Sequence, residues 1–559
     1  MVNGVSDLLK NRLESLIKGA ALEAQQRGLC PAGALPEVMV EHPPDARLGD
    51  YACNLALKLA RVAGTSPLSL AQALVKLLPP VDEVARVEVA PPGFINFTLS
   101  EQWLQQQVEA IVVDGEAYGN TDQGKGARVQ VEFVSANPTG PLHVGHGRGA
   151  VIGSALANVL SVAGYKVERE YYINDAGSQI EAFSESLYTR YQQAFGMEAE
   201  MPASGYQGHY VKVVAEQIKG EEGRRLLDLA RKEAVAELGK IGLQLMLAAI
   251  RDDLSLLNVE YDNWFSEQDL YSGGQYEKAM GMLRQGGYVA DKEGATWFTS
   301  TALGENKDNV LVRSDGTPTY FAADVAYHYD KFAKRGFDRV IDIWGADHQG
   351  HVSRMRTAVE AMGIDPKRLT IIISQLVTLK RGEQAVRLSK RSGEIITLRE
   401  VIEEVGPDAC RFFFLSRSAD SQMDFDLELA KKQSLDNPVY YVQYAHARIA
   451  SILRFMEEKG GEYGEGDVSL LVAEPELSLI RKMIALPEVI ETVAATLEPH
   501  YLPYYAQELA TVFHSFYMQC RVVTDDKALT AARLKLVKAA RQVFSKTLRL
   551  MGMGVPDMM

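Results

Sequence analysis

Cysteine is scarce in this sequence, and its scarcity excludes two ways of stabilising a small domain. The four cysteines are scattered along 559 residues and form no C-x-x-C pair: Cys30, Cys53, Cys410 and Cys520. Such spacing supports neither a disulfide framework nor a Cys-rich structural zinc site. It fits a reducing compartment, and we expect a cytoplasmic protein.

Long apolar runs are missing as well. No uninterrupted run of about 18 apolar residues occurs, so no membrane span is expected. The opening Met-Val-Asn-Gly-Val-Ser-Asp lacks a basic segment followed by an apolar one, so no signal peptide is expected. Without low-complexity tracts, and with 47% hydrophobic and 24% charged residues, the chain has a globular composition. At 559 residues it is too long for one core and should form several domains.

Acidic residues outnumber basic ones, and the net charge of −14 by itself argues against a nucleic-acid partner. The stretch 527–549, however, holds seven basic residues and no acidic one. Lys535, Lys538, Arg541 and Arg549 recur there at roughly helical spacing. Such a helix could present a basic face to a phosphate backbone or merely to solvent, and the charges alone favour neither.

The order of predicted elements divides the chain into three domains. Residues 1–118 are expected to form an α+β domain, with a helix at 7–27 and strands within 87–98. Residues 426–559 are predicted to be all α, with helices near 437–457, 474–497, 503–522 and 527–551. The polar turn 120–126 marks the first boundary.

The middle domain, residues 119–425, alternates strands with helices. This alternation is typical of an α/β, Rossmann-like parallel sheet with crossover connections. Strands are expected at 129–134, 166–172, 338–344 and 370–377. A long helical block near 206–257 is predicted to interrupt them as an insertion.

A glycine-rich turn after the first of these strands carries the main functional signal. Gly145, Gly147 and Gly149 would let a polyphosphate approach the start of the following helix, where free N–H groups favour anions. His143 and His146 add two imidazoles that can donate to phosphate oxygens. The turn is neither a Walker loop nor a dinucleotide fingerprint.

The wider segment Ser135-Ala-Asn137-Pro-Thr-Gly-Pro-Leu-His143-Val-Gly-His146 resembles the HIGH signature of class I aminoacyl-tRNA synthetases, in the form of their arginine-specific branch. The resemblance implies catalytic roles for His143 and His146, and ATP contacts for them with Gly145 and Gly147. It also implies that Ser135 and Asn137 contact the amino acid.

A second element of this family follows about 240 residues later. Val386-Arg387-Leu-Ser389-Lys390-Arg-Ser-Gly393 resembles the KMSKS loop, which closes over ATP. The resemblance implies that Arg387, Ser389 and Lys390 bind ATP and that Lys390 is catalytic. Arg387 departs from the family pattern because it stands where the first lysine is usual, and arginine is not equivalent to lysine.

An arginine substrate needs carboxylates and an aromatic face for its guanidinium. Tyr320 and Asp324 are four residues apart and would share a helix face. In the family, a Tyr and an Asp at this spacing hold the arginine side chain, and Glu267 matches a second family carboxylate.

The segment Trp344-Gly-Ala-Asp347-His348-Gln349 follows a predicted buried strand, where ligands of open α/β sheets bind. It resembles the family's W-G-x-D-H segment, which implies that Asp347 contacts ATP. Gln349 is taken as the arginine contact, with His348 as the alternative if the alignment slips by one. The pair His348 and His351 could also suggest a metal, but no further ligand set is evident.

Taken together, the resemblance covers the whole chain and implies ATP-dependent joining of L-arginine to its tRNA through an arginyl-adenylate. The N-terminal domain, with its Leu48-Gly-Asp-Tyr51 motif, would contact the tRNA corner, and the helical domain would bind the anticodon. ATP would bring Mg²⁺, no structural metal is expected, and a monomer is expected. Two alternatives stay open: a nucleotidyltransferase that acts on a small molecule without tRNA, and a non-catalytic tRNA-binding paralogue.

Overall fold

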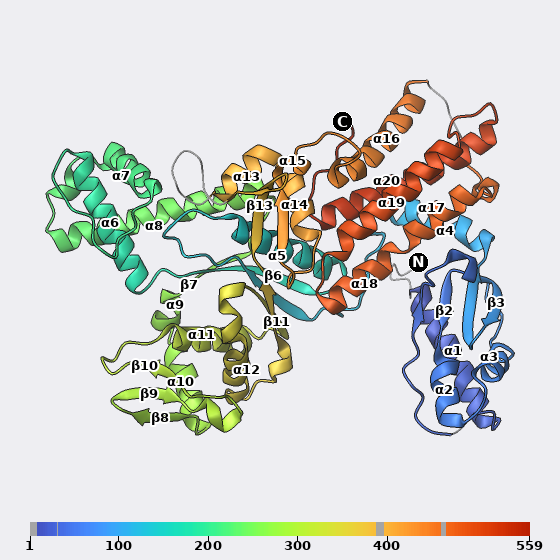
Figure 1. Cartoon of the computed structure of the whole chain (residues 1–559), viewed down its shortest axis with the longest axis horizontal. Helices are drawn as coiled ribbons and strands as arrows, with labels where there is room; N and C mark the ends of the chain where they lie inside the picture. Colours follow the sequence, from blue (N-terminus) through green and yellow to red (C-terminus); the bar gives the residue numbers. More distant parts are fainter. Residues whose placement is uncertain (1–7, 31, 387–395, 460–464) are drawn as a thin grey trace.

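The computed structural model describes residues 8–30, 32–386, 396–459 and 465–559. These residues form three bodies, which Figure 1 colours from blue to red along the sequence. An N-terminal body lies at one end, a central α/β body carries a five-stranded sheet, and a helical body joins the two. In the described part of the chain, no helix is long and apolar enough to cross a membrane.

The N-terminal body is an antiparallel sheet, in the order β1-β2-β4-β3, covered by helices. Its elements are α1 (Leu9–Gln26), β1 (Val40–Glu41), β2 (Tyr51–Cys53), α2 (Leu55–Ala63), α3 (Pro67–Val75), β3 (Val84–Ala90), β4 (Phe94–Leu99) and the connecting α4 (Glu101–Asp114). The helix and strands predicted here are confirmed. The segment 48–51, however, leads into strand β2 and not directly into a helix, because Tyr51 and Cys53 are buried in pairing with β4.

The central sheet is parallel throughout, in the order β12-β11-β5-β6-β7. Its strands are β5 (Arg128–Phe133), β6 (Lys166–Ile173), β7 (Asn263–Ser266), β11 (Arg339–Gly345) and β12 (Leu369–Ser374). The helices around it include α5 (Val144–Val162), α11 (Tyr320–Tyr329), α12 (Val352–Ala361), α13 (Leu398–Val405) and α14 (Pro407–Leu415). All residues of β5 after Arg128 are buried, as expected for a strand covered on both faces. The four predicted strands are therefore confirmed as β5, β6, β11 and β12.

Two insertions interrupt the strands of the sheet, the first between β6 and β7 and the second between β7 and β11. One is a helical lobe with its own apolar core, made of α6 (Ser178–Ala194), α7 (His209–Glu222) and α8 (Arg231–Leu256). The other holds α9 (Gln268–Ser272), α10 (Gln275–Gln285), β8 (Val289–Lys292), β9 (Ala295–Phe298) and β10 (Asn309–Val312). Both lobes project from the sheet on the side away from the N-terminal body (Figure 1).

A small second sheet links the central body to the helical one. It consists of β13 (Val377–Arg381), β14 (Gln384–Ala385) and β15 (Met423–Asp426), and β13 pairs with β15 in parallel. The segment 387–395, which contains Arg387, Ser389 and Lys390, lies outside the described residues. The predicted positions of these three side chains therefore stay predictions.

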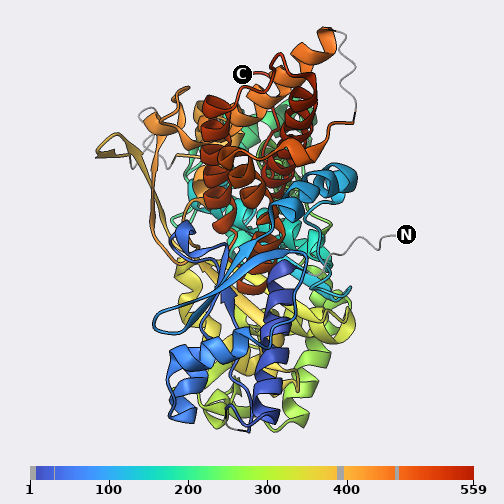
Figure 2. The same cartoon turned by 90° about the vertical axis from the view of Figure 1, so that its right-hand side faces the viewer.

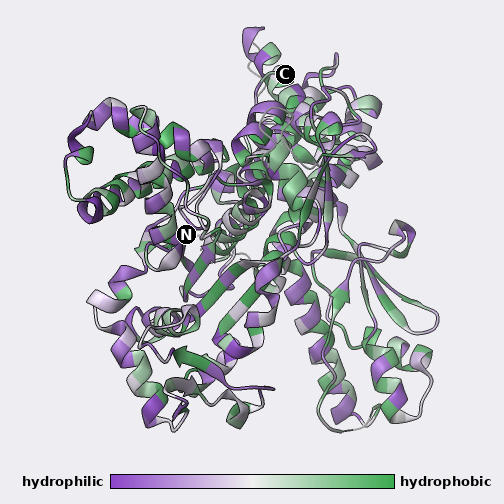
Figure 3. Cartoon of the chain, turned by 60° about the vertical axis from the view of Figure 1, so that its left-hand side comes forward, coloured by the Kyte–Doolittle hydropathy of each residue, from purple (hydrophilic) through white to green (hydrophobic). Residues whose placement is uncertain are grey.

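The C-terminal body is helical, as predicted. Its helices are α15 (Leu427–Ala430), α16 (Pro438–Glu458), α17 (Glu474–Ile484), α18 (Leu486–Thr496), α19 (Tyr501–Gln519) and α20 (Lys527–Leu550). The single helix predicted at 474–497 is two helices that meet at Ala485. Pro487 lies in the first turn of α18, where its missing N–H is tolerated, and so marks a helix start. Figure 3 shows that apolar and polar residues both occur along the helices near the C-terminus.

The basic face predicted on α20 is largely occupied within the protein. Lys535 pairs with Glu109 at 3.0 Å, Arg549 pairs with Glu116 at 2.6 Å, and Arg541 pairs with Asp557 at 2.8 Å. Because these partners come from α4, from the turn after it and from the end of the chain, the face mainly joins the bodies. The face thus meets acidic residues of the protein itself, which neither of the two readings left open by the sequence included.

The N-terminal body also docks on the helical body through the Leu48–Tyr51 motif. Asp50 pairs with Arg481 of α17 at 2.8 Å, and the Tyr51 hydroxyl donates to Glu488 of α18. His42 contacts the same Glu488 at 3.2 Å, which raises the pKa of its imidazole despite burial. Figure 2, seen from this side, shows the helical body above the N-terminal one. The motif thus contributes to the interface between these two bodies.

Candidate active site

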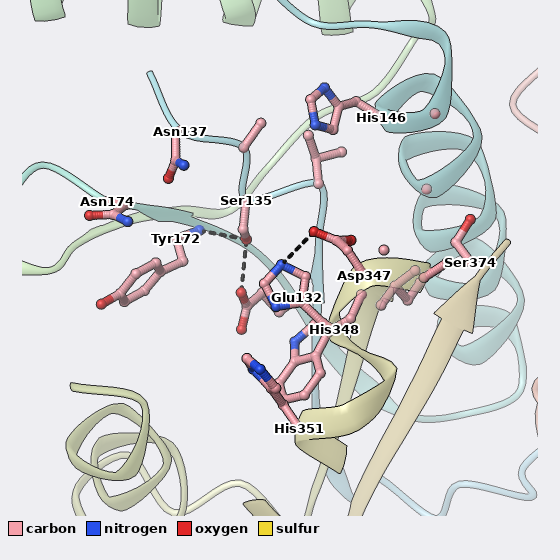
Figure 4. A pocket seen from close by; sticks show the side chains of 18 of the residues that line it. Glu132, Ser135, Asn137, His146, Tyr172, Asn174, Asp347, His348, His351 and Ser374 are labelled. Carbon is pink, nitrogen blue, oxygen red and sulfur yellow. Dashed lines mark hydrogen bonds and ion pairs between the residues drawn. The ribbon is translucent and has the colours of Figure 1, made fainter. Parts of the chain in front are cut away.

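A cavity of about 500 Å³ opens at the carboxyl ends of the central strands, beside the start of α5. Side chains from β5, β6, β11 and β12 converge on it (Figure 4). The sequence-predicted residues that line it are Ser135, Asn137, His143, Gly145, His146, Tyr320, Asp324 and Asp347. Segments predicted to act together, but separated by up to about 200 residues, therefore meet in one place.

Three other predicted residues do not line the cavity. Gly147 packs beneath it, where a Cβ would come within 2.5 Å of Leu398. Gln349 is exposed on the 3-10 turn Ala346–His351, whereas its neighbour His348 lines the wall. The structure therefore favours His348 over Gln349 at this wall. Glu267 lies behind the wall and is only 5% exposed.

The two signature imidazoles cap the helix that follows them. His143 Nδ1 accepts a hydrogen bond from Gly145 N at 3.1 Å, and His146 Nδ1 accepts one from His143 N at 3.3 Å. Their rings stack with centroids 3.6 Å apart. Because each Nδ1 is an acceptor, a neutral ring carries its proton on Nε2. Both side chains can therefore donate a hydrogen bond from Nε2.

Burial keeps these imidazoles neutral. It lowers the pKa of His146 to about 3, helped by the neighbouring His143, and it lowers the pKa of His143 as well, against the opposing effect of Asp347. The sequence left open whether the two rings are neutral or charged at neutral pH. The structure supports two neutral donors beside the amide groups of the helix start.

The backbone just before the signature is strained. Val134 and Ser135 both adopt positive φ, 69° and 40°, a region that costs a β-branched residue on the order of 1–3 kcal/mol. The Ser135 hydroxyl donates to Glu132 at 2.8 Å and accepts from Tyr172 N at 3.1 Å. These bonds hold Ser135 on the cavity wall, between β5 and β6 (Figure 4).

Acidic groups surround the part of the cavity near α11. Burial raises the pKa of Asp324 to about 6. Burial also raises the pKa of Glu267 to about 7, helped by the charges of Asp324 and Asp175 and opposed by a hydrogen bond from the Tyr172 hydroxyl. Tyr320 stands at the mouth, 46% exposed. The pKa of Asp324 stays raised although His328, Arg354 and Lys331 lie near it, and such a carboxylate suits a cationic ligand.

A buried ionic network lies beneath these carboxylates. Lys331 is fully buried and pairs with Glu132 at 2.5 Å and with Asp342 at 2.8 Å. His328 contacts Asp342 at 3.0 Å and the backbone oxygen of Asp324 at 2.8 Å. Although burial raises it, the pKa of Asp342 falls to about 2 because of Lys331 and His328. The network fixes the part of α11 that presents Asp324.

Sequence reasoning missed several lining residues. They are Glu132, Tyr172, Gln179, Tyr327, His328, Arg354, Ser374, Gln375 and Leu376, together with apolar residues. Gly149, Trp344, Gly345, His348 and His351 also line the cavity and belong to segments that the sequence had already singled out. A signal existed for part of this set, because Ser374, Gln375 and Leu376 lie toward the carboxyl end of the strand predicted at 370–377, where ligands of such sheets bind. His328 and Lys331 follow Asp324 by four and seven residues, the spacing of one helix face.

The residues that follow segment 387–395 lie against the signature turn beside the cavity. Leu398 N donates to Leu142 O at 2.8 Å, and Thr397 forms an isolated bridge with His143. Before the segment, Val386 N donates to Leu379 O at 2.8 Å within the β13 hairpin. The chain therefore re-enters the described structure beside the signature turn.

Among the described residues, the two histidines of the 3-10 turn Ala346–His351 do not belong to a metal cage. The rings of His348 and His351 lie 5.5 Å apart, edge to face. Across the four described ranges, no group of three or more His, Cys, Asp or Glu side chains is placed to hold a metal ion.

Comparison with known proteins identifies the family. The catalytic-domain model of class I tRNA synthetases (R) matches residues 107–420. The arginyl tRNA synthetase N terminal domain matches 7–99, and the DALR anticodon binding domain matches 442–559. The chain is 58% identical to the arginine–tRNA ligase of Dehalococcoides mccartyi over 99% of both chains. The chain belongs to the arginyl-tRNA synthetase family.

As a member of this family, the protein charges tRNA with arginine. The reaction consumes ATP and is a step of protein synthesis. The arginine–tRNA ligase of Moorella thermoacetica is 48% identical over 98% of this chain and 99% of its own. The crystal structure of Thermus thermophilus arginyl-tRNA synthetase has the same fold, with a TM-score of 0.78 at 24% identity over 99% of this chain and 100% of that one. All three domains of the family are thus present.

Proposed function

We propose that the cavity binds arginine and ATP side by side and that its residues divide between the two. The guanidinium lies against Asp324 and Tyr320, with Glu267 supplying a second carboxylate behind the wall. Ser135 and Asn137 face the rest of the amino acid. The convergence of neutral imidazoles and acidic groups on one cavity is the observation that carries this assignment.

The chemistry follows from this arrangement. The arginine carboxylate attacks the α-phosphorus in line, the bond to the β-phosphate oxygen breaks, and arginyl-adenylate and pyrophosphate form. No side chain needs to act as a covalent nucleophile, so catalysis consists of positioning and charge stabilisation. His143 and His146 donate to phosphate oxygens, while Asp347 contacts the nucleotide and Lys390 the leaving pyrophosphate.

Arginine then passes from the adenylate to the 2′-hydroxyl of the terminal ribose of the tRNA, in the manner of class I enzymes. We propose that ATP brings Mg²⁺ on its phosphate oxygens and that the protein acts as a monomer. Domains spanning 1–118, 119–425 and 426–559 would contact the tRNA corner, the acceptor end and the anticodon, respectively. Light scattering of the purified protein during gel filtration tests the monomer, since a dimer would double the mass of 61.6 kDa.

Replacing Asp324 by Asn should weaken arginine binding several-fold to a hundredfold. The change keeps the size of the side chain but removes one charge-assisted contact, worth about 1–3 kcal/mol. ATP affinity should be unchanged. Equilibrium dialysis with labelled arginine gives the dissociation constant, and Asp315→Asn is the matched control, because Asp315 is exposed in the same segment and bonds only to Thr317. Unchanged arginine affinity in Asp324→Asn would place the guanidinium elsewhere.

Arginine affinity should fall as pH is lowered from about 8 to about 5.5. The substrate guanidinium stays charged, whereas Glu267 and Asp324, with pKa values of about 7 and about 6, must lose protons to bind it. For one linked proton the dissociation constant rises roughly tenfold per pH unit below the pKa. Calorimetric titrations in buffers of different ionisation enthalpy should show proton release near pH 6.5, an order-of-magnitude midpoint.

The raised pKa values of Glu267 and Asp324 also make the free energy of unfolding depend on pH. The folded protein binds more protons than the unfolded chain between the ordinary carboxylate pKa and about 7, so these groups stabilise the ligand-free protein less as pH rises through that window. Glu267→Gln should move the pH dependence of arginine binding below about 6, where Asp324 titrates. A dissociation constant that stays flat between pH 5.5 and 8 would contradict the assignment of both carboxylates.

A further inference from the structure

Arg148 is a fully buried arginine two residues after His146 in α5. Its guanidinium donates three hydrogen bonds to backbone oxygens: Nη1 to Gln375 at 2.9 Å and to Ser421 at 2.8 Å, and Nη2 to Ser418 at 2.8 Å. One side chain therefore ties the signature helix to the connection between β12 and β13 and to the turn before β15.

These two acceptor segments behave as one unit. Gln375 N donates to Ala419 O at 2.8 Å, and Met423 N donates to Leu376 O at 3.2 Å. Their strands β13 and β15 then pair in parallel. The unit supplies Ser374, Gln375 and Leu376 to the cavity wall, and β13 carries the chain toward segment 387–395.

Burying the charged guanidinium of Arg148 costs solvation free energy. Burial lowers the pKa of Arg148 to about 10, so the group still carries its charge at neutral pH, and its Nε has no hydrogen-bond partner. Its hydrogen-bond acceptors are carbonyl oxygens, which offset part of the desolvation cost. Replacing Arg148 would leave these three carbonyl oxygens without their donor, so the link also contributes to stability. Three hydrogen bonds from one planar guanidinium also fix the distance and the direction between α5 and the segments that accept these bonds.

We propose that Arg148 is a positioning residue for adenylate formation. It sets the separation between the signature turn, which carries His143 and His146, and the facing wall formed by Ser374–Leu376. It also anchors the strand that leads into the KMSKS-like segment. This proposal rests on the function proposed above, because only a reaction between two substrates in this cavity makes that separation matter. An error of about 1 Å in such a separation costs roughly a hundredfold in rate.

The test compares Arg148→Lys and Arg148→Met with the same changes at Arg411. Arg411 is the matched control: it is equally buried, its pKa is also lowered to about 10, and it donates to Met551 O, Leu257 O and Ser154 Oγ. It lies where α14 meets the ends of α8 and α20 and does not line the cavity. Arginine-binding stoichiometry counts the folded sites, and ATP–pyrophosphate exchange gives kcat and KM for ATP per site.

Per folded site, Arg148→Met should lower kcat about a hundredfold and raise KM for ATP, with arginine affinity nearly unchanged. Arg148→Lys retains the positive charge but not the planar guanidinium, and it should lower kcat about tenfold. This variant provides the test if Arg148→Met does not fold. The Arg411 variants should lower only the melting temperature. The proposal is overturned if the Arg148 variants also lose melting temperature alone. Failure of the proposed function would instead appear as unaltered arginine affinity in Asp324→Asn.

Discussion

Replacing His146 by Ala should slow adenylate formation by about 10²- to 10³-fold, which corresponds to roughly 3–4 kcal/mol of lost transition-state stabilisation. The reason lies in its geometry. His146 Nδ1 accepts from the backbone of His143, and burial keeps the ring neutral, so Nε2 carries a proton that can be donated to phosphate oxygens. In His146→Ala, the negative charge that develops on the phosphate oxygens during the reaction would lose this hydrogen-bond donor. Pyrophosphate exchange at saturating ATP and arginine measures the loss.

Two comparisons distinguish this role from damage to the fold. Arginine affinity should be nearly unaffected in His146→Ala, because the acidic end of the cavity is built from α11 and from Glu267 after β7. His146→Asn keeps a donor and an acceptor in a smaller side chain and should retain more activity than Ala. If binding and rate fell together in His146→Ala, the change would be a folding defect and the assigned role would be wrong.

Lys390→Ala should slow activation on a similar scale, on the order of 10²- to 10³-fold, while leaving tRNA affinity almost unchanged. Pyrophosphate departs with negative charge, and a cation on a closing loop can neutralise it as it forms. The flanking residues of the segment support such a reach, since Thr397 bridges His143 at the signature turn. Exchange rates and filter binding of tRNA with the same variant separate the two effects.

Arg387→Ala is the natural companion variant within the same loop. Arg387 stands where the family usually has lysine, and a guanidinium contacts phosphate as a broad fork and not as a point charge. Its loss should therefore be less damaging than the loss of Lys390. A larger effect at Arg387 would reverse the roles of the two residues. Normal exchange in both variants would make the segment an ordinary solvated basic loop.

Local patterns were sufficient for much of the fold and for the turn that carries His143 and His146. The run Val129–Val134 followed by glycines and histidines predicts a strand, a turn and a helix start, and β5 and α5 occupy those positions. Tyr320 and Asp324 were found because helical spacing and family resemblance coincide there. Such features depend on residues close together in the sequence.

Features that depend on distant contacts were not predictable in this way. The ion pair between Glu132 and Lys331 joins residues 199 positions apart, and nothing local to either residue indicates the other. The basic stretch of α20 looks free in the sequence, but Glu109 and Glu116 of the N-terminal side neutralise part of it. Gly147 was assigned to ATP because of its place in the turn, whereas tertiary packing against Leu398 requires its small size.

The choice between Gln349 and His348 illustrates a finer limit. The two residues are adjacent, so one residue of slippage exchanges them, and sequence similarity alone did not settle the alignment. The 3-10 turn after β11 places His348 in the cavity wall and Gln349 outside it, although both residues are exposed. Side-chain direction in such a short turn depends on backbone geometry that composition does not determine.

One measurement tests the central claim most directly: ATP–pyrophosphate exchange with each of the twenty amino acids in turn, with and without tRNA. We expect exchange with arginine and with no other amino acid, and loss of that exchange in His146→Ala. Exchange driven equally well by lysine or by an uncharged amino acid would contradict the acidic pocket around Asp324. No exchange with any amino acid, even with tRNA present, would contradict the assignment of the cavity as the site of adenylate formation.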